Sequence, residues 1–327
     1  MSKAEKEQWR EWCQSDPNIH IFMRDWWLDA VCGSDNWDCI IESSEYSGGG
    51  LSRAALPFYK IKSHGFNVIA QPKLTQKIGP YVKLGDGLSK QESADMSNQL
   101  MGKLLDRLPT EVDSVNFSMD WHISDGEPFL VRGYELTTHY TDVILDLNDM
   151  EVVYKNFDSK LRTHIRKAEK IVTVKECPDI ETFYEIDSKT FARQNMSMPY
   201  SIDFVKHLDE VLVEHNARKM WMAVDEQDRI HAVEYLVWDE HSAYLLMGGA
   251  DPNLRNSYAT NLLVWEAIQY AVTVTRMFDF EGSIMPNVNP FNRMYGPIEI
   301  PYLSVSKRQS KLYNLLWHGK QAVANII

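Results

Sequence analysis

The sequence has 327 residues, of which 44% are hydrophobic, and it carries 34 Lys and Arg against 46 Asp and Glu. This length suits about two domains, and the composition is typical of a folded protein rather than a disordered or fibrous one. The formal net charge of −12 argues against a broad, non-specific nucleic-acid binder, although one local basic groove is compatible with it.

The cysteines and the N-terminus indicate a reducing compartment. Cys13, Cys32, Cys39 and Cys177 show no CxxC spacing, so we expect buried thiols rather than a zinc site or disulfides. The N-terminus has no apolar leader, and no stretch approaches ~20 consecutive apolar residues. We therefore expect a cytoplasmic protein without a covalently bound cofactor, whose contact with any membrane is peripheral.

The first half of the chain mixes helices with strands. The pattern predicts helices over 3–14, 21–31 and 90–108, and strands near 38–42, 51–59, 66–70, 112–119, 128–135 and 141–146. The glycine-rich stretch 43–50, SSEYSGGG, stands between two alternating runs and indicates a hairpin tip. A phosphate cradle is the alternative, but no GK[ST] follows.

After residue 149 a similar order begins again. We predict helices over 158–170, 179–195, 202–215, 256–274 and 309–324, and strands at 171–176, 219–224, 230–238, 242–249, 276–280 and 299–306. The repeated order indicates an α+β fold of two domains, 1–149 and 150–327, each with a twisted, largely antiparallel mixed sheet flanked by helices. The last helix is a candidate for packing on the first domain.

A basic helix is the clearest electrostatic feature of this acidic chain. Arg162, Arg166 and Lys170 are spaced four residues apart and share one helical face. Arginine grips phosphate in a bidentate manner, so the face is a candidate anion clamp. A solvated helix surface is the alternative interpretation.

A second candidate anion site lies at the start of the predicted helix 256–274. A strand ends in Gly248-Gly249, a short turn follows, and Arg255 and Ser257 stand where the helix begins. Free backbone N–H groups at a helix start bind anions. Simple N-capping by Ser257 is the alternative, and both can hold together.

Two carboxylates are candidates for acid–base chemistry. Glu234 stands among apolar residues in the strand 230–238, where loss of solvation raises a carboxyl pKa. Asp279 alternates with Phe278 and Phe280 at the end of another strand. Either could act as a general base or orient an ammonium group. A structural ion pair is the alternative for Glu234, and a solvent-facing strand end for Asp279. We expect no metal at Asp279, because no His or Cys stands near it.

Five segments in fixed order carry a resemblance to a known family. They are HYTDVILDLND, SKLRTHIRKAEK, FARQNMSMPYS, GGADPNLRNSYATNLLVWEAIQYA and FDFEGSIMPNVNPFNRMYG. This order resembles the FemAB-type peptidoglycan interpeptide-bridge transferases, and more closely their BioF2-like relatives in the acyl-CoA N-acyltransferase (GNAT) superfamily. The resemblance implies tandem GNAT-like domains with a cleft between them. It also implies an acyl-CoA or aminoacyl-tRNA co-substrate, with tRNA then a partner, and a primary-amine acceptor such as a cell-wall precursor peptide.

The resemblance also assigns residues. It places the start of the helix near Arg255 in the pyrophosphate-loop region of acyl-CoA transferases. Phe291 and Tyr295 match a motif in which the interpeptide-bridge transferases carry an aromatic–lysine pair, but Asn292 replaces the lysine and Arg293 follows it. We therefore predict an N-acyltransferase with Glu234 or Asp279 as base. The alternative is a catalytically inactive protein of the same fold that binds an anionic small molecule.

Overall fold

The computed structural model describes residues 3–46, 50–281 and 289–315. The chain forms two compact units, which are considered separately. One unit contains Met1–His139 with Pro301–Ile327, and the other contains Tyr140–Ile300. The sequence predicted a border after residue 149. In this division the second unit starts at Tyr140, and the segment from Pro301 onward belongs to the first unit.

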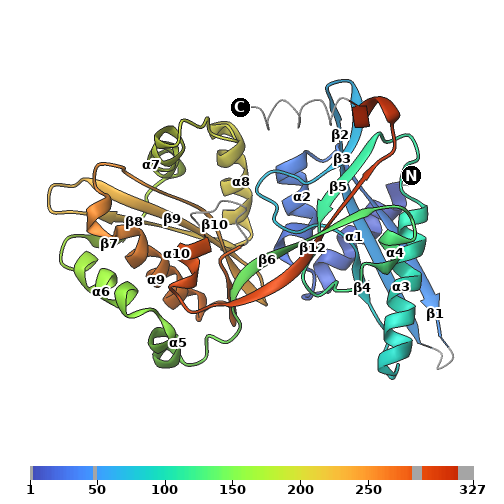
Figure 1. Ribbon diagram of the computed structural model, residues 1–327, viewed down its shortest axis with the longest axis horizontal. Helices are drawn as coiled ribbons and strands as arrows, with labels where there is room; N and C mark the ends of the chain where they lie inside the picture. Colours follow the sequence, from blue (N-terminus) through green and yellow to red (C-terminus); the bar gives the residue numbers. More distant parts are fainter. Residues whose placement is uncertain (1–2, 47–49, 282–288, 316–327) are drawn as a thin grey trace. The chain divides into compact units, whose positions relative to one another are not determined.

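The first unit contains a mixed sheet with strand order β1-β2-β3-β5-β12, and β4 pairs with β2 at the side (Figure 1). Its strands are β1 (Trp37–Glu45), β2 (Leu51–Ser63), β3 (Phe66–Ala70), β4 (Tyr81–Lys83), β5 (Ser114–Ser118) and most of β12 (Ile298–Arg308). Only β3 and β5 pair in parallel among these strands. The helices are α1 (Lys3–Ser15), η1 (Ile21–Met23), α2 (Asp25–Cys32), α3 (Lys90–Asp106) and α4 (Glu127–Leu130).

β1 and β2 form the hairpin that the glycine-rich stretch predicted. Their register runs from Trp37 opposite Tyr59 to Glu45 opposite Leu51. Residues 47–49 of the tip lie outside the described part of the chain. Of the helix predicted over 309–324, residues 311–315 are helical and the rest lies outside the described residues.

The strand predicted over 128–135 is wrong. The segment begins instead with the short helix α4, and β6 starts only at Glu135. Pro128 occupies the first turn of α4, where its fixed φ and missing N–H suit a helix start. Gly133 then turns the chain with a φ of 75°. Proline and glycine thus override the apolar pattern of this stretch.

The second unit contains the sheet β6-β11-β10-β9-β8-β7 (Figure 1). Its strands are the second half of β6 (Glu135–Ile144), β7 (Thr173–Glu176), β8 (Arg218–Val224), β9 (Ile230–Trp238), β10 (Ser242–Ala250) and β11 (Met277–Asp279). The other elements are α5 (Met150–Asn156), α6 (Ser159–Ala168), α7 (Ile180–Arg193), α8 (Ile202–Glu214), η2 (Arg255–Ser257), α9 (Ala259–Ala271) and α10 (Asn289–Arg293). The predicted α+β class is confirmed.

Helices cover both faces of this second sheet. α7 and α8 lie on one face, and α6 and α9 lie on the other (Figure 1). Leu161 and Ile165 of α6 join Leu263 and Ile268 of α9 in a buried core with Leu236 of β9. No helix in the described ranges is long and apolar enough to span a membrane.

The second sheet opens along one edge of β10. β10 and β11 run parallel but pair only over Ser242–Tyr244 and Met277–Asp279. β10 continues to Ala250, and its pairing with β9 is interrupted by an irregularity between Leu245 and Met247. Beyond Tyr244, no described strand pairs with the β11 side of β10. Among the described residues, this half of β10 therefore has a strand neighbour only on its β9 side.

Candidate active site at the end of strand β10

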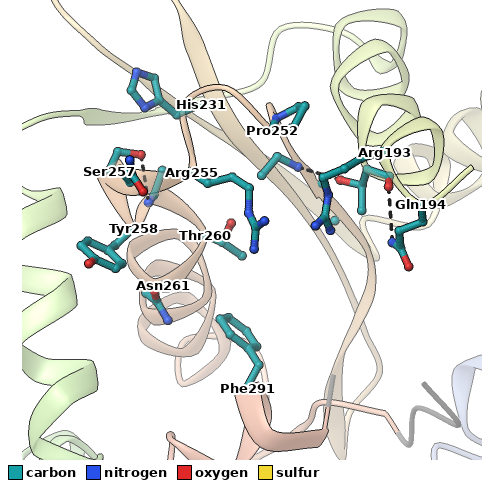
Figure 2. A pocket seen from close by; sticks show the side chains of 16 residues that line it. Arg193, Gln194, His231, Pro252, Arg255, Ser257, Tyr258, Thr260, Asn261 and Phe291 are labelled. Atoms are coloured by element: carbon teal, nitrogen blue, oxygen red, sulfur yellow. Dashed lines mark hydrogen bonds between the residues drawn. The ribbon is translucent and has the colours of Figure 1, made fainter. Parts of the chain in front are cut away.

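A pocket of about 970 Å³ lies at the end of β10, within the second unit (Figure 2). Its walls come from the last turn of α7, the end of β10, η2, the first turn of α9 and Phe291 of α10. Gly248 and Gly249 line it, so the pocket reaches the half of β10 that has parted from β11.

Two arginines from distant parts of the sequence meet in this pocket. Arg193 closes α7, and Arg255 opens η2. Figure 2 shows both side chains running into the same open space between α7 and α9. Both residues are exposed, and no ion pair joins either guanidinium to another described residue. Paired guanidinium groups without carboxylate partners suit a phosphate or diphosphate ligand.

The first turn of α9 adds to this positive site. Its N-cap, Tyr258, has left-handed backbone angles (φ 59°, ψ 26°), and its side chain makes no capping hydrogen bond. The positive end of the dipole of this 13-residue helix favours an anion beside its first turn. The Tyr258 ring is held from outside by His164, which stacks on it at 3.9 Å between centroids. Burial lowers the pKa of His164, with help from Lys160 and Lys167.

Glu234 does not itself line the pocket, but it lies directly against Gly248, which does. It pairs with Gly248 across β9 and β10, and only 6% of its surface is exposed. A Cβ atom at position 248 would lie 2.2 Å from Glu234 Oε2, so the carboxyl group fills the space of the missing side chain. Burial, and then the charge of Asp187, raise the pKa of Glu234 well above its ordinary value. This confirms the environment expected of a carboxyl group inside this strand.

A second carboxyl group, Asp187 of α7, was not predicted. A Cβ atom at Gly249 would lie 2.4 Å from Asp187 Cα and 3.0 Å from its Oδ1. Asp187 is 1% exposed, and the Tyr200 hydroxyl donates a hydrogen bond to its Oδ2 at 3.0 Å. Burial raises the pKa of Asp187 to about 7. The two consecutive glycines of β10 thus each contact an acidic residue: Gly248 lies against Glu234, and Gly249 lies against Asp187.

The Asp187 carboxyl group should make the protein less stable as pH rises from 5 to 7. Its pKa is about 7 in the fold and near 3.9 unfolded, so the folded state holds one more proton between these values. Stability then falls with rising pH by at most about 1.4 kcal/mol per unit. Urea unfolding at pH 5, 6 and 7 should give a shallower fall for Asp187→Asn than for wild type; parallel curves would contradict the assignment.

Asp279 has a different setting from Glu234. It ends β11, is 1% exposed, and pairs with Tyr244 where β10 and β11 part. Its Oδ1 accepts hydrogen bonds from the Thr141 hydroxyl at 2.5 Å and from the Glu281 N–H at 2.8 Å. Asp279 does not line the pocket described above. These two hydrogen bonds hold the Asp279 carboxylate at the end of β11.

The basic helix α6 contributes no side chain to this pocket. Arg162 donates hydrogen bonds to the carbonyl oxygens of Lys155, at 2.9 Å, and Phe157, where α5 ends. Arg166 is exposed, and its Nε donates to the Arg162 carbonyl at 3.2 Å. Lys170 is exposed in the turn that follows. The Arg162 side chain thus caps a neighbouring helix, a role that spacing alone does not distinguish from ligand binding.

Three of the other predicted binding residues do meet in the pocket: Arg255, Ser257 and Phe291. The Ser257 hydroxyl donates to the Leu254 carbonyl at 2.8 Å and lies 3.4 Å from the Ala259 N–H, so it shapes the turn before α9. Arg293 instead forms an ion pair with Glu299 at 2.6 Å. No cluster of three or more His, Cys, Asp or Glu side chains suited to a metal occurs among the residues that the structure describes.

Sequence reasoning missed Asp187 and Arg193. Both lie on α7, whose apolar stripe includes Phe183 and Ile186, and Asp187 falls on that stripe. An acidic residue on the buried face of a helix was the available signal. Arg193 carried no local signal, because only the tertiary fold places it opposite Arg255.

Comparison with known proteins identifies a domain and a fold. Residues 155–286 match the model of the acetyltransferase (GNAT) domain. The fold is similar to that of FemX, with 12% identity, a TM-score of 0.66, and 95% of this chain and 98% of that chain covered. It is also similar to the C-terminal domain of a proposed lysylphosphatidylglycerol synthetase from Agrobacterium fabrum, with 12% identity, a TM-score of 0.54 and 98% of both chains covered. No curated protein is similar enough in sequence to count as a relative.

The domain match defines the class: the protein is an acyltransferase. Residues 155–286 form a GNAT domain, and the fold along the chain is similar to that of FemX. The pocket lies inside this matched segment apart from Phe291. The family resemblance expected from the sequence is therefore confirmed.

Proposed function

We propose that the protein is an N-acyltransferase that moves an acyl group from a phosphate-bearing carrier to a primary amine. Acyl-CoA is the first candidate for the carrier, and aminoacyl-tRNA is the second. The observation that carries the proposal is that Arg193 and Arg255 line the same pocket at the start of α9. The match to the GNAT domain favours acyl-CoA, and the FemX-like fold keeps an aminoacyl donor as the alternative.

The chemistry requires a neutral amine beside a carbonyl group. In the proposed reaction the amine nitrogen attacks the carbonyl carbon, a C–N bond forms, and the C–S bond of the thioester breaks. The ionised form of Glu234 accepts the proton that leaves the amine, and the thiolate departs. A raised pKa brings the proton affinity of Glu234 closer to that of an amine, which makes this transfer less unfavourable. Positioning in the pocket supplies a further part of the rate.

A donor and acceptor screen tests the function. The protein is incubated with acetyl-CoA and a panel of primary amines, including amino sugars and lysine-containing peptides. Release of free thiol is followed by colour reaction, and the N-acyl product is identified by mass spectrometry. A parallel assay uses aminoacyl-tRNA. Product with either donor supports the proposal, whereas stable binding of both donors without any product would overturn it.

Removing either pocket arginine should weaken donor binding. Charge-assisted hydrogen bonds contribute about 1.5–3 kcal/mol, so Arg193→Ala or Arg255→Ala should raise the Kd for CoA about tenfold or more. Both residues are exposed, so the melting temperature should change little. Titration calorimetry measures Kd, and the loss should shrink at high salt.

Arg166→Ala is the matched control, because Arg166 is an exposed arginine of the same unit that does not line the pocket. Its Kd for CoA should equal that of wild type. An equal loss in all three variants would instead support the basic helix as the anion clamp. Unchanged binding in both pocket variants would remove the phosphate site.

The acceptor is proposed from resemblance. The ordered segments of the sequence resemble interpeptide-bridge transferases, and the fold is similar to FemX. We therefore include the amine of a cell-wall precursor peptide among the acceptors. The rival function, a binding protein without catalysis, is favoured by Asn292 at the position where the resembling transferases carry lysine. Asn292 is 3% exposed and so is not a free side chain at the surface.

A further inference from the structure

A second positive surface adjoins the pocket on the side of α6. Lys160, His164 and Lys167 are spaced four and three residues apart, so they share one face of α6. The His164 ring stacks on the Tyr258 ring at 3.9 Å between centroids and 11° between planes. Lys167 Nζ lies 5.7 Å from the centroid of the same Tyr258 ring. Because Tyr258 lines the pocket, this face of α6 borders the pocket.

The two lysines of this face are available to an anion. Both are exposed, and no carboxylate pairs with either amino group among the residues that the structure describes. Burial lowers the pKa of His164, and both lysines add to this effect, so both charges lie near the ring stack. The Asp158 carboxylate caps the helix by accepting from the Lys160 N–H at 2.6 Å, and Glu169 lies about half a turn away from Lys160.

The pocket and this face of α6 present two separate positive groups. Figure 2 shows the Arg255 and Tyr258 side chains leaving the start of α9 in opposite directions. Arg193 and Arg255 thus lie on one side of the Tyr258 ring position, and the lysines lie on the other. Coenzyme A carries a diphosphate on the 5′ oxygen of its ribose and a single phosphate on the 3′ oxygen. Two positive groups with a neutral border between them match two phosphate groups with one sugar between them.

We propose that Lys160 and Lys167 bind the 3′ phosphate of a coenzyme A donor beside the stack of Tyr258 and His164. The proposal rests on the acyl transfer proposed above and names its carrier. A lysine ammonium is a compact charge that suits a single phosphate, whereas the planar arginine groups suit the diphosphate. The 3′ phosphate is remote from the thioester, so its contacts strengthen binding of the carrier without accelerating the chemical step.

3′-Dephospho-CoA isolates this contact, because it lacks only the 3′ phosphate. Exposed ion pairs contribute modestly, so two of them should let wild type bind CoA about three- to tenfold more tightly than 3′-dephospho-CoA. Lys160→Gln combined with Lys167→Gln should remove this preference by weakening the binding of CoA alone. KM for acetyl-CoA should rise by the same factor, with kcat unchanged. Titration calorimetry at low salt measures Kd, and melting curves check that the variant is folded.

Arg166→Gln combined with Lys170→Gln is the matched control, because it removes the same charge from outside the face that borders Tyr258. This variant should keep the wild-type preference for CoA. An equal loss in both double variants, or no preference in wild type, would overturn the 3′-phosphate site and leave the acyl transfer standing. So would a protein that acylates amines only from aminoacyl-tRNA. A protein with the expected preference that forms no product from any donor would support the site and overturn the proposed function.

Discussion

Glu234→Gln is expected to lower kcat about 10²–10⁴-fold, the usual contribution of a positioned general base. Glutamine has the shape of the protonated carboxyl group, which the raised pKa favours near neutral pH, so the variant should stay folded. Rates measured from pH 6 to pH 9 should show an acidic limb in wild type that is missing in the variant. If Glu234 had only a structural role, the Glu234→Gln protein would instead be less stable, and its rate per folded molecule would be unchanged.

Asp279→Asn is the matched control for this experiment. Asparagine keeps an oxygen that can accept from Thr141 and from the Glu281 N–H, so the end of β11 should hold. If Asp279→Asn retains activity while Glu234→Gln loses it, Glu234 is the base. Equal losses would mean that both carboxyl groups are needed, as the sequence alone allowed. Full activity in both variants would leave positioning as the source of the rate.

Gly249→Ala is expected to be among the most destabilising single-methyl changes in the second unit. The new Cβ would lie 2.4 Å from Asp187 Cα, and this backbone atom moves only if α7 shifts away from β10. Overpacking of this kind costs about 1–3 kcal/mol or more. Thr190 accepts the Ala250 N–H at 3.0 Å, so the shift should also weaken donor binding. Urea unfolding and calorimetry with CoA measure the two effects.

Gly248→Ala provides the comparison at the next position. There the new Cβ would meet Glu234 Oε2, the end of a side chain, at 2.2 Å. Shortening that side chain removes the clash, so Gly248→Ala combined with Glu234→Ala should be more stable than the sum of the two changes predicts. No truncation of Asp187 relieves Gly249→Ala, because the clash is with its backbone. A Gly249→Ala protein as stable as wild type would contradict the close packing of α7 on β10.

Most of the second unit could be predicted from local patterns. The runs that became β8, β9 and β10 are short and largely apolar, and the stretch that became α9 is longer and apolar, so both their type and their burial could be predicted. The segment around α4 was misread because its apolar residues favoured a strand, whereas Pro128 and Gly133 determine the backbone. Short elements such as β4 and α5 depend on neighbours that sequence alone does not supply.

The site was predictable only where one residue carries its own signal. Glu234 in an apolar strand and Arg255 before the start of α9 could be found in this way. The sequence alone could not show whether Arg162 binds a ligand or has a structural role. Its partners are carbonyl groups at the end of α5, and backbone groups leave no signal in a sequence. Arg193 and Asp187 reach the site through the packing of α7 on β10, a contact between segments about 60 residues apart.

The gap in the second sheet bears on how this site can change during evolution. Past Tyr244 no described strand pairs with the β11 side of β10, and the edge of a strand is made of peptide groups, which every amino acid carries. A ligand that pairs with such an edge is recognised as an added strand would be, without the help of particular side chains. Most substitutions along this half of the strand therefore leave the edge intact, and the tight restriction falls on Gly248 and Gly249. Descendants of one ancestor can then keep the same opening and retain little else in common by sequence.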